Sequence, residues 1–459
     1  MLTHSQEVAF KLVKEGKSIF IAGPGGCGKT FLIERIREWG IESGKTIALT
    51  ALTGRAANLF KGRTIHSWAG IMTGEKSVDE LYRLIRCRPK VLRSWLTSDI
   101  LVVDEISMMS AELFNKLVLL ARRIRRKEIG FGGIQILFSG DFCQLPPVKA
   151  DRFCFESKYF PEVIQETVQM TESIRQTDSI FLNILNEIRF GDLSDRSFEI
   201  LKTRLITDVD LRRIQSGNKL DIKPTLLYPR KDDVSMENET CLQALNEEIL
   251  EIECVDKYFL RIDNLVRPIN TTDLRRGTQD SVDKMFEGQN FPKVVRLAVG
   301  AQVMYTRNMS DTAIVNGSRG VIVRFAEISN FPIVRFDEES GGIDLEIVPI
   351  EIEIDLGEYL VKRKQIPLIL CWAITCHKSQ GSTLTNVVTN LAGAFCAGQV
   401  YVTLSRVRSL AGLQILDIDR SKIWCDPKVR SFYLDPPGPR PRPEPEPGAI
   451  RRCFIPADL

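Results

Sequence analysis

Four short apolar runs organise the first third of the chain. Each is continuously apolar and rich in β-branched residues, which is typical of strands buried on both faces of a parallel sheet; the runs cover residues 18–22, 46–49, 100–103 and 134–138. Stretches with helical periodicity lie between them, at 30–39 and 111–126. This alternation predicts a doubly wound α/β domain, in which ligands bind beyond the carboxyl ends of the strands.

A β-rich segment interrupts the second half of the chain. From about residue 294 to 353, strand-like patterns alternate with turn signals at Asn316-Gly317 and Gly341-Gly342, which predicts a small β-barrel-like insert. The α/β pattern lies on both sides of it, as a helix at 178–191, a strand at 226–229 and a strand–loop–helix block at 368–384.

Length and composition are those of a globular protein with more than one domain. The chain has 459 residues, of which 44% are hydrophobic and 26% charged, so we expect two or three domains. The sequence has no apolar run of about 18 residues and no secretion-signal pattern at its start. We therefore expect an intracellular protein with no membrane partner. Residues 435–447 are proline-rich and cannot build a core.

Charge and cysteine content restrict the kinds of site to be expected. The formal net charge is only +3, so a nucleic acid would have to be held by a local basic groove. The 11 cysteines are scattered, with no C-x-x-C pair. A zinc or iron–sulfur site needs closely spaced ligands, so we expect reduced, partly buried thiols instead.

Residues 23–30 (GPGGCGKT) satisfy the phosphate-binding pattern G-x-x-x-x-G-K-[ST]. They follow a predicted strand and open a predicted helix, which is the context that supports the pattern. Glycines let backbone N–H groups wrap phosphates at the helix N-terminus. Lys29 is expected to reach the β- and γ-phosphates and Thr30 to bind Mg²⁺. The predicted ATP contacts of this loop are Gly23, Gly25, Gly26, Cys27, Gly28, Lys29 and Thr30.

Further candidates for hydrolysis follow the later strands. Asp104 and Glu105 come directly after the third apolar run; the aspartate suits contact with Mg²⁺ and the glutamate suits a general base. Gln144 lies in the loop after the fourth run and is placed to sense the γ-phosphate. Hydrolysis also needs positive charge on the transferred group, and Arg175 and Arg406 are the candidates.

Taken together, these motifs resemble the PIF-one (petite integration frequency) helicases of superfamily one, the 5′-to-3′ branch that also holds RecD-type enzymes. The resemblance runs from about Leu2 to Leu413. Its most discriminating part is the family's signature segment between the second and third motifs, matched here by residues 121–125 (ARRIR), 131–135 (FGGIQ) and 140–142 (GDF). Generic P-loop proteins lack this segment.

The resemblance implies two RecA-like P-loop domains with parallel sheets that close on ATP and Mg²⁺, and an ATP-dependent 5′-to-3′ DNA helicase with a role in genome maintenance. It places Gln6 to read adenine. The expected domains are residues 1–168, with an accessory pin insert at about 71–97; residues 169–434, with the β-rich insert at about 292–366; and a disordered tail at 435–459. Because the chain starts almost at Gln6, the long N-terminal segments of family members are expected to be absent.

The family's DNA-contacting motifs also have counterparts, and the resemblance implies DNA contacts by Thr53, Gly54, Thr64, His66, Ser67, His377, Lys378, Ser379 and Gln380. Trp95 is a guess for the strand-separating wedge, with core packing as the alternative. The basic run at 122–127 fits a DNA-lining surface and a solvated helix face equally well. Residues 362–364 are interpreted as a solvated loop.

Alternatives to this reading stay open. The chain could be a RecD- or Dda-like helicase of the same branch, although the signature segment argues against it, or an ATP-gated DNA-binding or remodelling factor without productive unwinding. The expected partners are single-stranded DNA and 5′-tailed duplex or fork DNA, bound by a monomer. The proline-rich tail either recruits a protein or is simply disordered. The expected location is the nucleus or another DNA-containing compartment in a eukaryote or virus, and the cytoplasm in a bacterium.

Overall fold

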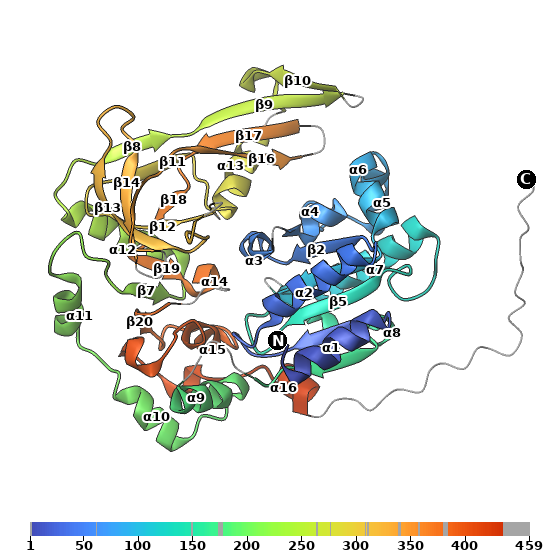
Figure 1. Ribbon diagram of the computed structural model, residues 1–459, viewed down its shortest axis with the longest axis horizontal. Coiled ribbons are helices and arrows are strands. Elements are labelled where there is room, and N and C mark those ends of the chain that lie inside the picture. Colours follow the sequence, from blue (N-terminus) through green and yellow to red (C-terminus); the bar gives the residue numbers. More distant parts are fainter. Residues whose placement is uncertain are drawn as a thin grey trace, which may run out of the picture.

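The computed structural model describes residues 2–60, 62–147, 150–172, 178–262, 265–275, 277–307, 309, 312–337, 341–356, 359–379 and 384–434. Two α/β lobes lie side by side, and antiparallel sheets extend from the second lobe across the top of the first (Figure 1). The predicted fold class, two RecA-like domains with parallel sheets and β-rich inserts, is confirmed by this arrangement.

Lobe 1 (residues 2–172) is built on a six-stranded sheet with the order β3-β2-β4-β5-β1-β6. All its strand pairs are parallel. The strands are β1 (Ile19–Ala22), β2 (Ile47–Ala51), β3 (Arg63–Thr64), β4 (Ile100–Asp104), β5 (Gln135–Gly140) and β6 (Glu166–Gln169). The helices are α1 (His4–Lys14), α2 (Lys29–Glu42), α3 (Gly54–Leu59), α4 (Ile65–Ala69), α5 (Val78–Arg86), α6 (Pro89–Thr97), α7 (Ala111–Arg125) and α8 (Phe160–Val163).

The four predicted apolar runs form β1, β2, β4 and β5, and every residue of β1 and β4 is buried. Burial on both faces is the reason these strands are apolar throughout instead of alternating. The predicted helices at 30–39 and 111–126 correspond to α2 and α7. The sheet thereby brings the ends of β1, β4 and β5 together at one edge.

Lobe 2 has a smaller parallel sheet with the order β19-β7-β20-β21. Its strands are β7 (Thr225–Tyr228), β19 (Ala373–Thr375), β20 (Val387–Asn390) and β21 (Leu413–Asp417). Its helices are α9 (Ser179–Phe190), α10 (Asp195–Lys202), α11 (Asp208–Gln215), α12 (Lys231–Ala244), α14 (Cys376–Ser379) and α15 (Gln399–Leu404). The predicted helix at 178–191 and strand at 226–229 are confirmed as α9 and β7.

The inserted β region is larger than predicted and starts earlier. A five-stranded sheet contains β15 (Asp344–Glu346), β14 (Pro332–Phe336), β13 (Arg319–Phe325), β12 (Gln302–Tyr305) and β18 (Leu368–Leu370) in that order. A four-stranded sheet contains β10 (Leu265–Ile269), β9 (Val255–Ile262), β17 (Tyr359–Gln365) and β16 (Ile350–Asp355), and a strand pair joins β11 (Val294–Leu297) to β8 (Leu250–Glu253). The two predicted turns lie between strands, where Gly317, Gly341 and Gly342 have positive φ.

Arg363 holds the four-stranded sheet, named here the upper sheet (β9, β10, β16 and β17), to α13 (Thr278–Gly288). Its side chain is fully buried and donates to both carboxylate oxygens of Asp256, at 2.8 and 2.7 Å, and to Asp283 on α13. The prediction of a solvated loop at 362–364 is therefore wrong. The segment belongs to β17, whose alternate residues point inward, and Arg363 is one of them.

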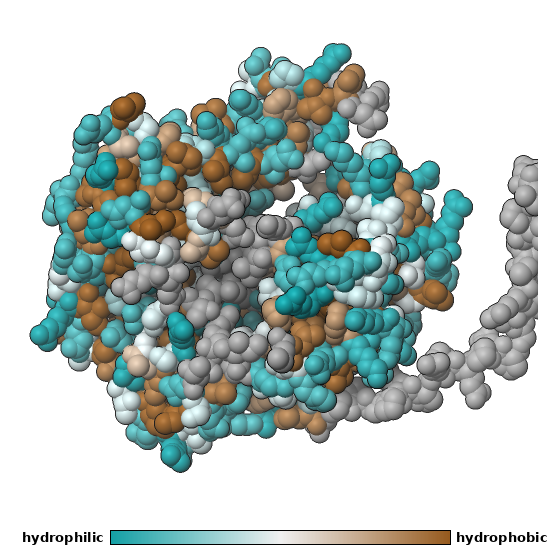
Figure 2. Space-filling model, in the orientation of Figure 1, coloured by the Kyte–Doolittle hydropathy of each residue, from teal (hydrophilic) through white to brown (hydrophobic). Residues whose placement is uncertain are grey.

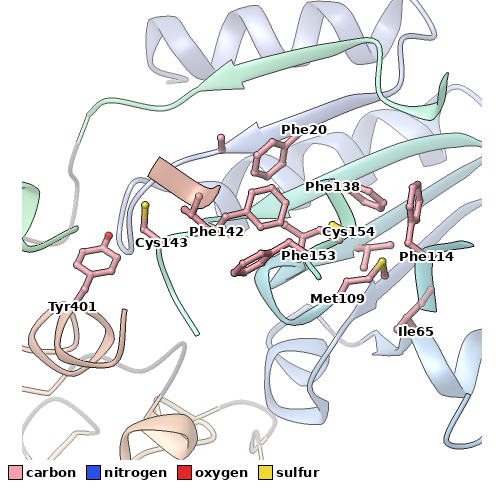
Figure 3. Close-up of a cluster of buried hydrophobic side chains, with 14 of the residues drawn as sticks. Phe20, Ile65, Met109, Phe114, Phe138, Phe142, Cys143, Phe153, Cys154 and Tyr401 are labelled. Carbon is pink, nitrogen blue, oxygen red and sulfur yellow. The ribbon is translucent and has the colours of Figure 1, made fainter. Parts of the chain in front are cut away.

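One hydrophobic core continues from lobe 1 into lobe 2. The last described helix, α16 (Pro427–Leu434), lies beneath lobe 1 (Figure 1). Its Phe432 stacks on Phe155 with ring centroids 4.5 Å apart and contacts Phe142 edge-on at 5.3 Å. Figure 3 shows Phe142 among the buried aromatic side chains of lobe 1, with Cys143 between it and Tyr401 of lobe 2. The interface between the lobes is therefore packed like a domain interior.

Within the described residues, every helix is too short or too polar to cross a lipid bilayer. The ten cysteines in that part of the chain form no disulfide bond with one another.

Replacing Arg363 with methionine is expected to destabilise the upper sheet by about 3–5 kcal/mol, because two carboxylates would lose their buried partner. Hydrogen exchange of the amides in β9, β17 and α13 would measure this directly. Lys362→Met is the matched control, since the neighbouring lysine forms only an exposed pair with Glu351. Equal exchange rates in the two variants would contradict this role of Arg363.

Candidate functional site

The loop between β1 and α2 has the geometry of a phosphate cradle. Gly26 and Gly28 adopt left-handed conformations, with φ of 87° and 81°, which residues with a Cβ rarely adopt. Lys29 Nζ lies over the loop and donates to the carbonyl oxygens of Gly23 and Pro24, each at 2.8 Å. An ammonium group is thus held beside a glycine-rich turn at the start of a helix, where phosphates bind in this class of loop.

Gln6 braces α1 against this loop. Its side chain is buried, its Nε2 donates to the carbonyl oxygen of Gly28 at 3.3 Å, and its Oε1 accepts from the Thr3 N–H at 2.9 Å. Both ends of the amide are engaged by protein groups in this conformation. Contact between Gln6 and adenine stays a prediction.

Asp104 and Glu105 lie at the end of β4, next to the phosphate loop. Asp104 is buried, and burial raises the pKa of its carboxyl group, while the charge of Lys29 acts in the opposite direction. Glu105 has a left-handed backbone with φ of 55°, a conformation uncommon outside glycine that clusters at functional sites. The backbone therefore changes direction at Glu105, directly after β4 ends at Asp104.

Thr30 and Asp104 fit a Mg²⁺ ion that is bound largely through a nucleotide. In nucleotide sites Mg²⁺ takes one or two protein ligands, with phosphates and water supplying the rest. Over the ranges that the structure describes, no cluster of three or more His, Cys, Asp or Glu side chains could hold a metal alone. A divalent cation would also stabilise the ionised form of Asp104, which burial disfavours.

A buried ion pair joins the lobes next to this site. Arg189 on α9 donates from Nε and Nη2 to the two carboxylate oxygens of Asp141, at 2.9 and 3.0 Å. Burial alone would raise the pKa of Asp141, but Arg189 holds it below its ordinary value. The pair therefore stabilises the fold above about pH 4, where an unfolded aspartate ionises, and this stabilisation is lost as pH falls through the lower folded-state pKa.

Two tyrosine hydroxyls complete the surroundings of the Asp141 carboxylate. Tyr401 on α15 donates to Oδ2 at 3.2 Å, and Tyr433 on α16 donates to Oδ1 at 3.3 Å. Burial, with the nearby Asp141 charge, raises the pKa of both phenols, so both stay protonated donors. We call Asp141, Arg189, Tyr401 and Tyr433 the Asp141 cluster.

Gln144 is buried beneath the N-terminus of α15. Gly398 caps that helix with φ of 71°, and a Cβ at this position would collide with the carbonyl oxygen of Cys143. A glycine is thus required for lobe 2 to approach the loop that carries Gln144. The predicted γ-phosphate sensor therefore lies at the contact between the lobes.

Arg406 follows α15 and reaches the same interface. Its guanidinium is buried, and it donates to the Val402 carbonyl oxygen at 3.1 Å and to Ser405 Oγ at 3.0 Å. Burial lowers the pKa of Arg406, and the charge of Glu105 in lobe 1 partly offsets this effect. One candidate arginine is therefore next to the candidate base. Arg175 lies outside the described residues.

The first two predicted DNA motifs lie together at the carboxyl edge of lobe 1. Thr53 follows β2 and Thr64 ends the neighbouring strand β3, and their hydroxyls accept from the N–H groups of Ala56 and Ser67, each at 3.2 Å. Burial lowers the pKa of His66, and Ser67 is exposed. The threonine hydroxyls thus fix the start of α3 and α4.

The third predicted DNA motif is only partly described. Gln380 and the side chains of His377 and Lys378 lie outside the part of the chain that the structure describes. Ser379 is fully buried and donates to the Cys376 carbonyl oxygen at 2.7 Å. In this conformation its hydroxyl closes α14, so the prediction of a direct DNA contact by this group is not supported by its position.

The accessory insert is tied to the second DNA motif by tryptophans. Trp95 on α6 is fully buried, its ring centroid lies 4.5 Å from that of Trp68 on α4, and its indole N–H donates to Ala69 at 3.1 Å. The wedge guess for Trp95 is therefore wrong, because the ring is core. Figure 1 shows α5 and α6 beside α4 at the top of lobe 1.

In the basic run at 122–127, Arg122 and Arg125 are structural, while Arg123, Arg126 and Lys127 are exposed as on a solvated helix face. Arg125 donates to the carbonyl oxygens of Trp95, Leu96 and Ser98 at the end of α6, at 2.9 to 3.2 Å. Arg122 pairs with Glu162 at 2.6 Å. Neither sequence interpretation, DNA lining or a solvated face, describes these two side chains, because their partners come from elements remote in sequence.

The Asp141 cluster was missed by sequence reasoning as a unit. Asp141 carries the same signal as Asp104, an acidic residue directly after an apolar strand, and could have been singled out on that basis. Arg189 and Tyr401 give no such signal, because a single arginine or tyrosine on an amphipathic helix is ordinary. Their partner becomes visible only when the two lobes are brought together.

These features define a P-loop protein of two RecA-like lobes, with candidate catalytic groups from both lobes at one interface. Residues 1–198 match the family described as PIF1-like helicase, and residues 287–325 match the 2B domain of DNA helicase Pif1. The chain is 37% identical over 439 residues to the human ATP-dependent DNA helicase PIF1, covering 94% of this chain and 63% of that protein. It thus spans less than two thirds of that relative's length.

Solved structures of Pif1 helicases are also similar to this chain. The Pif1 helicase from Candida albicans has a TM-score of 0.80 and 32% identity, covering 95% of this chain and 99% of that one. The Bacteroides Pif1 in complex with ADP-AlF3 and single-stranded DNA has a TM-score of 0.64 and 27% identity, covering 94% and 96%. The chain belongs to the PIF1-like helicase family.

Replacing Arg189 with methionine is expected to lower the stability of the lobe interface by about 3–5 kcal/mol, because Asp141 would remain buried without its charged partner. The double variant Asp141→Asn/Arg189→Met should recover part of this loss. Thermal melting of the three proteins measures both effects. A double variant that melts no higher than Arg189→Met would show that the lone carboxylate is not the cause.

Proposed function

We propose that the protein is an ATP-dependent 5′-to-3′ DNA helicase that couples ATP hydrolysis to movement along single-stranded DNA and to duplex unwinding, in the service of genome maintenance. One observation carries the proposal: the phosphate loop of lobe 1 bonds Tyr401 on α15 of lobe 2, and Arg406 at the end of the same helix is within electrostatic reach of Glu105. A site shared in this way couples hydrolysis to relative movement of the lobes.

In this proposal each group at the interface has a defined part in hydrolysis. Lys29 and the loop N–H groups hold the phosphates, and Mg²⁺ is held by Thr30 and Asp104. Glu105 accepts a proton from the attacking water, which Gln144 helps to place. Arg406, together with Arg175, neutralises charge that develops on the transferred phosphoryl group.

The DNA track in this proposal crosses the tops of both lobes. Lobe 1 contributes two turns, with Thr53 and Gly54 after β2, and Thr64, His66 and Ser67 from the end of β3 onward. Lobe 2 contributes the predicted motif at 377–380, without the buried Ser379 hydroxyl. Figure 2 shows an opening between the upper sheet and lobe 1, next to these turns. Phosphate contacts with few base contacts suit movement along any sequence. The Bacteroides Pif1 was solved in complex with ADP-AlF3 and single-stranded DNA. This supports the proposal that the present chain binds a nucleotide and single-stranded DNA.

The proposed substrate is single-stranded DNA that continues into a duplex or fork, with Mg²⁺–ATP as the fuel. The insert at 71–97 is the candidate for separating strands, because its helices α5 and α6 are anchored to α4, which carries His66. The insert and the DNA-contacting residues at the start of α4 would then move together. We propose that the protein works in a compartment that contains DNA. We also propose that it acts as a monomer.

Glu105→Gln is expected to slow ATP hydrolysis by about 10²–10⁴-fold with nucleotide binding retained, because the amide cannot accept a proton. Steady-state phosphate release and binding of a fluorescent ATP analogue measure the two effects. Lys29→Ala is the contrasting variant, expected to weaken nucleotide binding as well. Normal turnover in Glu105→Gln would remove this residue as the base.

The 5′-to-3′ direction of movement is tested by strand displacement on duplexes with either a 5′ or a 3′ single-stranded tail. The wild type should release the labelled strand from the 5′-tailed substrate in an ATP-dependent manner. Release from the 3′-tailed substrate alone would overturn the direction. ATP hydrolysis without release from either substrate would favour an ATP-gated binding or remodelling factor.

A further inference from the structure

Among the hydrogen bonds found for the described residues, the side chain of Tyr401 connects helix α15 to lobe 1. Its hydroxyl accepts from the Gly25 N–H of the phosphate loop at 3.3 Å and donates to Asp141 Oδ2 at 3.2 Å. Figure 3 shows the Tyr401 ring rising from its helix with the hydroxyl directed at the loop of Phe142 and Cys143. One oxygen atom therefore connects a lobe 2 helix to two functional loops of lobe 1.

The chemistry of the two partners fixes the direction of both hydrogen bonds. A backbone N–H can only donate and a carboxylate can only accept, so the phenol must accept from Gly25 and donate to Asp141. Burial raises the pKa of Tyr401, which keeps the proton on the oxygen. Phenylalanine has the same ring and can make neither bond, so the hydroxyl can be tested separately from the packing.

The same helix carries the candidate arginine. Arg406 lies just beyond α15 and is held to it by its bonds to Val402 and Ser405. The guanidinium therefore moves with the helix. Whatever fixes α15 relative to the phosphate loop also fixes Arg406 relative to Glu105 and the phosphates.

We propose that Tyr401 is a positioning residue for hydrolysis: by bonding Gly25 and Asp141 together, its hydroxyl sets the distance between the phosphate loop and Arg406. This inference rests on the proposed ATPase function. An arginine that acts on developing charge must be placed closely, because a displacement of about 1 Å can cost on the order of 10²-fold in rate. Tyr401 acts through Arg406 and does not itself meet the reacting atoms.

Tyr433 provides a matched control. Its hydroxyl also donates to Asp141, at 3.3 Å, and accepts from a backbone N–H, that of Phe142, at 3.0 Å. Both phenols are buried and their pKa values are raised in the same way. Tyr433 lies on α16, however, and bonds to no residue of the phosphate loop or of α15 within the hydrogen bonds found among the described residues. Each Tyr→Phe change thus removes one bond to Asp141 and one bond to a backbone N–H, but only the Tyr401 change removes a bond to the phosphate loop.

The experiment compares wild type, Tyr401→Phe and Tyr433→Phe. For each protein, kcat and KM for ATP are measured with saturating oligo(dT), together with the dissociation constants of ADP and of ADP–aluminium fluoride, which mimics the transition state. Tyr401→Phe should lower kcat by about 10- to 100-fold with KM and ADP affinity nearly unchanged. Its affinity for ADP–aluminium fluoride should fall by a similar factor.

Tyr433→Phe should lower the melting temperature about as much as Tyr401→Phe and leave the ratio of ADP–aluminium fluoride to ADP affinity at the wild-type value. An equal loss of kcat in both variants, or an unchanged kcat in Tyr401→Phe, would overturn the positioning role, because the hydroxyl would then act only through general stability. A wild type that hydrolyses no ATP in this assay would overturn the proposed function itself, and the two failures are therefore distinguished.

Discussion

The ion pair between Asp141 and Arg189 constrains how the two lobes can meet. A carboxylate with no exposed surface is tolerated only when its charge and hydrogen-bonding capacity are satisfied. In this protein lobe 1 supplies the carboxylate, and lobe 2 and α16 supply the guanidinium and two phenols. The lobes therefore fit together in one way around this charge, and that arrangement puts Arg406 near Glu105.

The same contact explains features that look unrelated in the sequence. Gly398 has to be a glycine because α15 approaches the Cys143 carbonyl oxygen so closely, and Tyr401 on that helix reaches the phosphate loop. Elsewhere in lobe 1, Trp95 attaches the accessory insert to α4, and Arg125 attaches it to α7. The phosphate loop and the turns proposed to contact DNA are thus both built onto one parallel sheet.

Local signals made much of the fold and the nucleotide site predictable. Continuous apolar runs identified β1, β2, β4 and β5, and the spacing of glycines with Lys29 and Thr30 identified the phosphate loop, because strand burial and loop geometry are both encoded in neighbouring residues. Asp104 and Glu105 could be placed for the same reason: they follow a strand whose end had to lie at the ligand edge of the sheet.

The parts that were missed depend on pairing between distant segments. Strand β9 pairs with β17 about a hundred residues later, and the role of Arg363 exists only once Asp256 and Asp283 are brought to it. Arg125 looked like part of a charged surface because its carbonyl partners lie in α6. Composition and periodicity describe a residue's own segment, so they do not reveal a partner of this kind.

The most direct test of the account is phosphate release by the wild-type protein with and without a single-stranded oligonucleotide. If strand binding brings the lobes together around the phosphates, oligo(dT) should raise the rate of ATP hydrolysis strongly, and the stimulation should weaken as salt displaces the strand. The same hydrolysis rate with and without the oligonucleotide would contradict the coupling of nucleotide and DNA through the lobe interface.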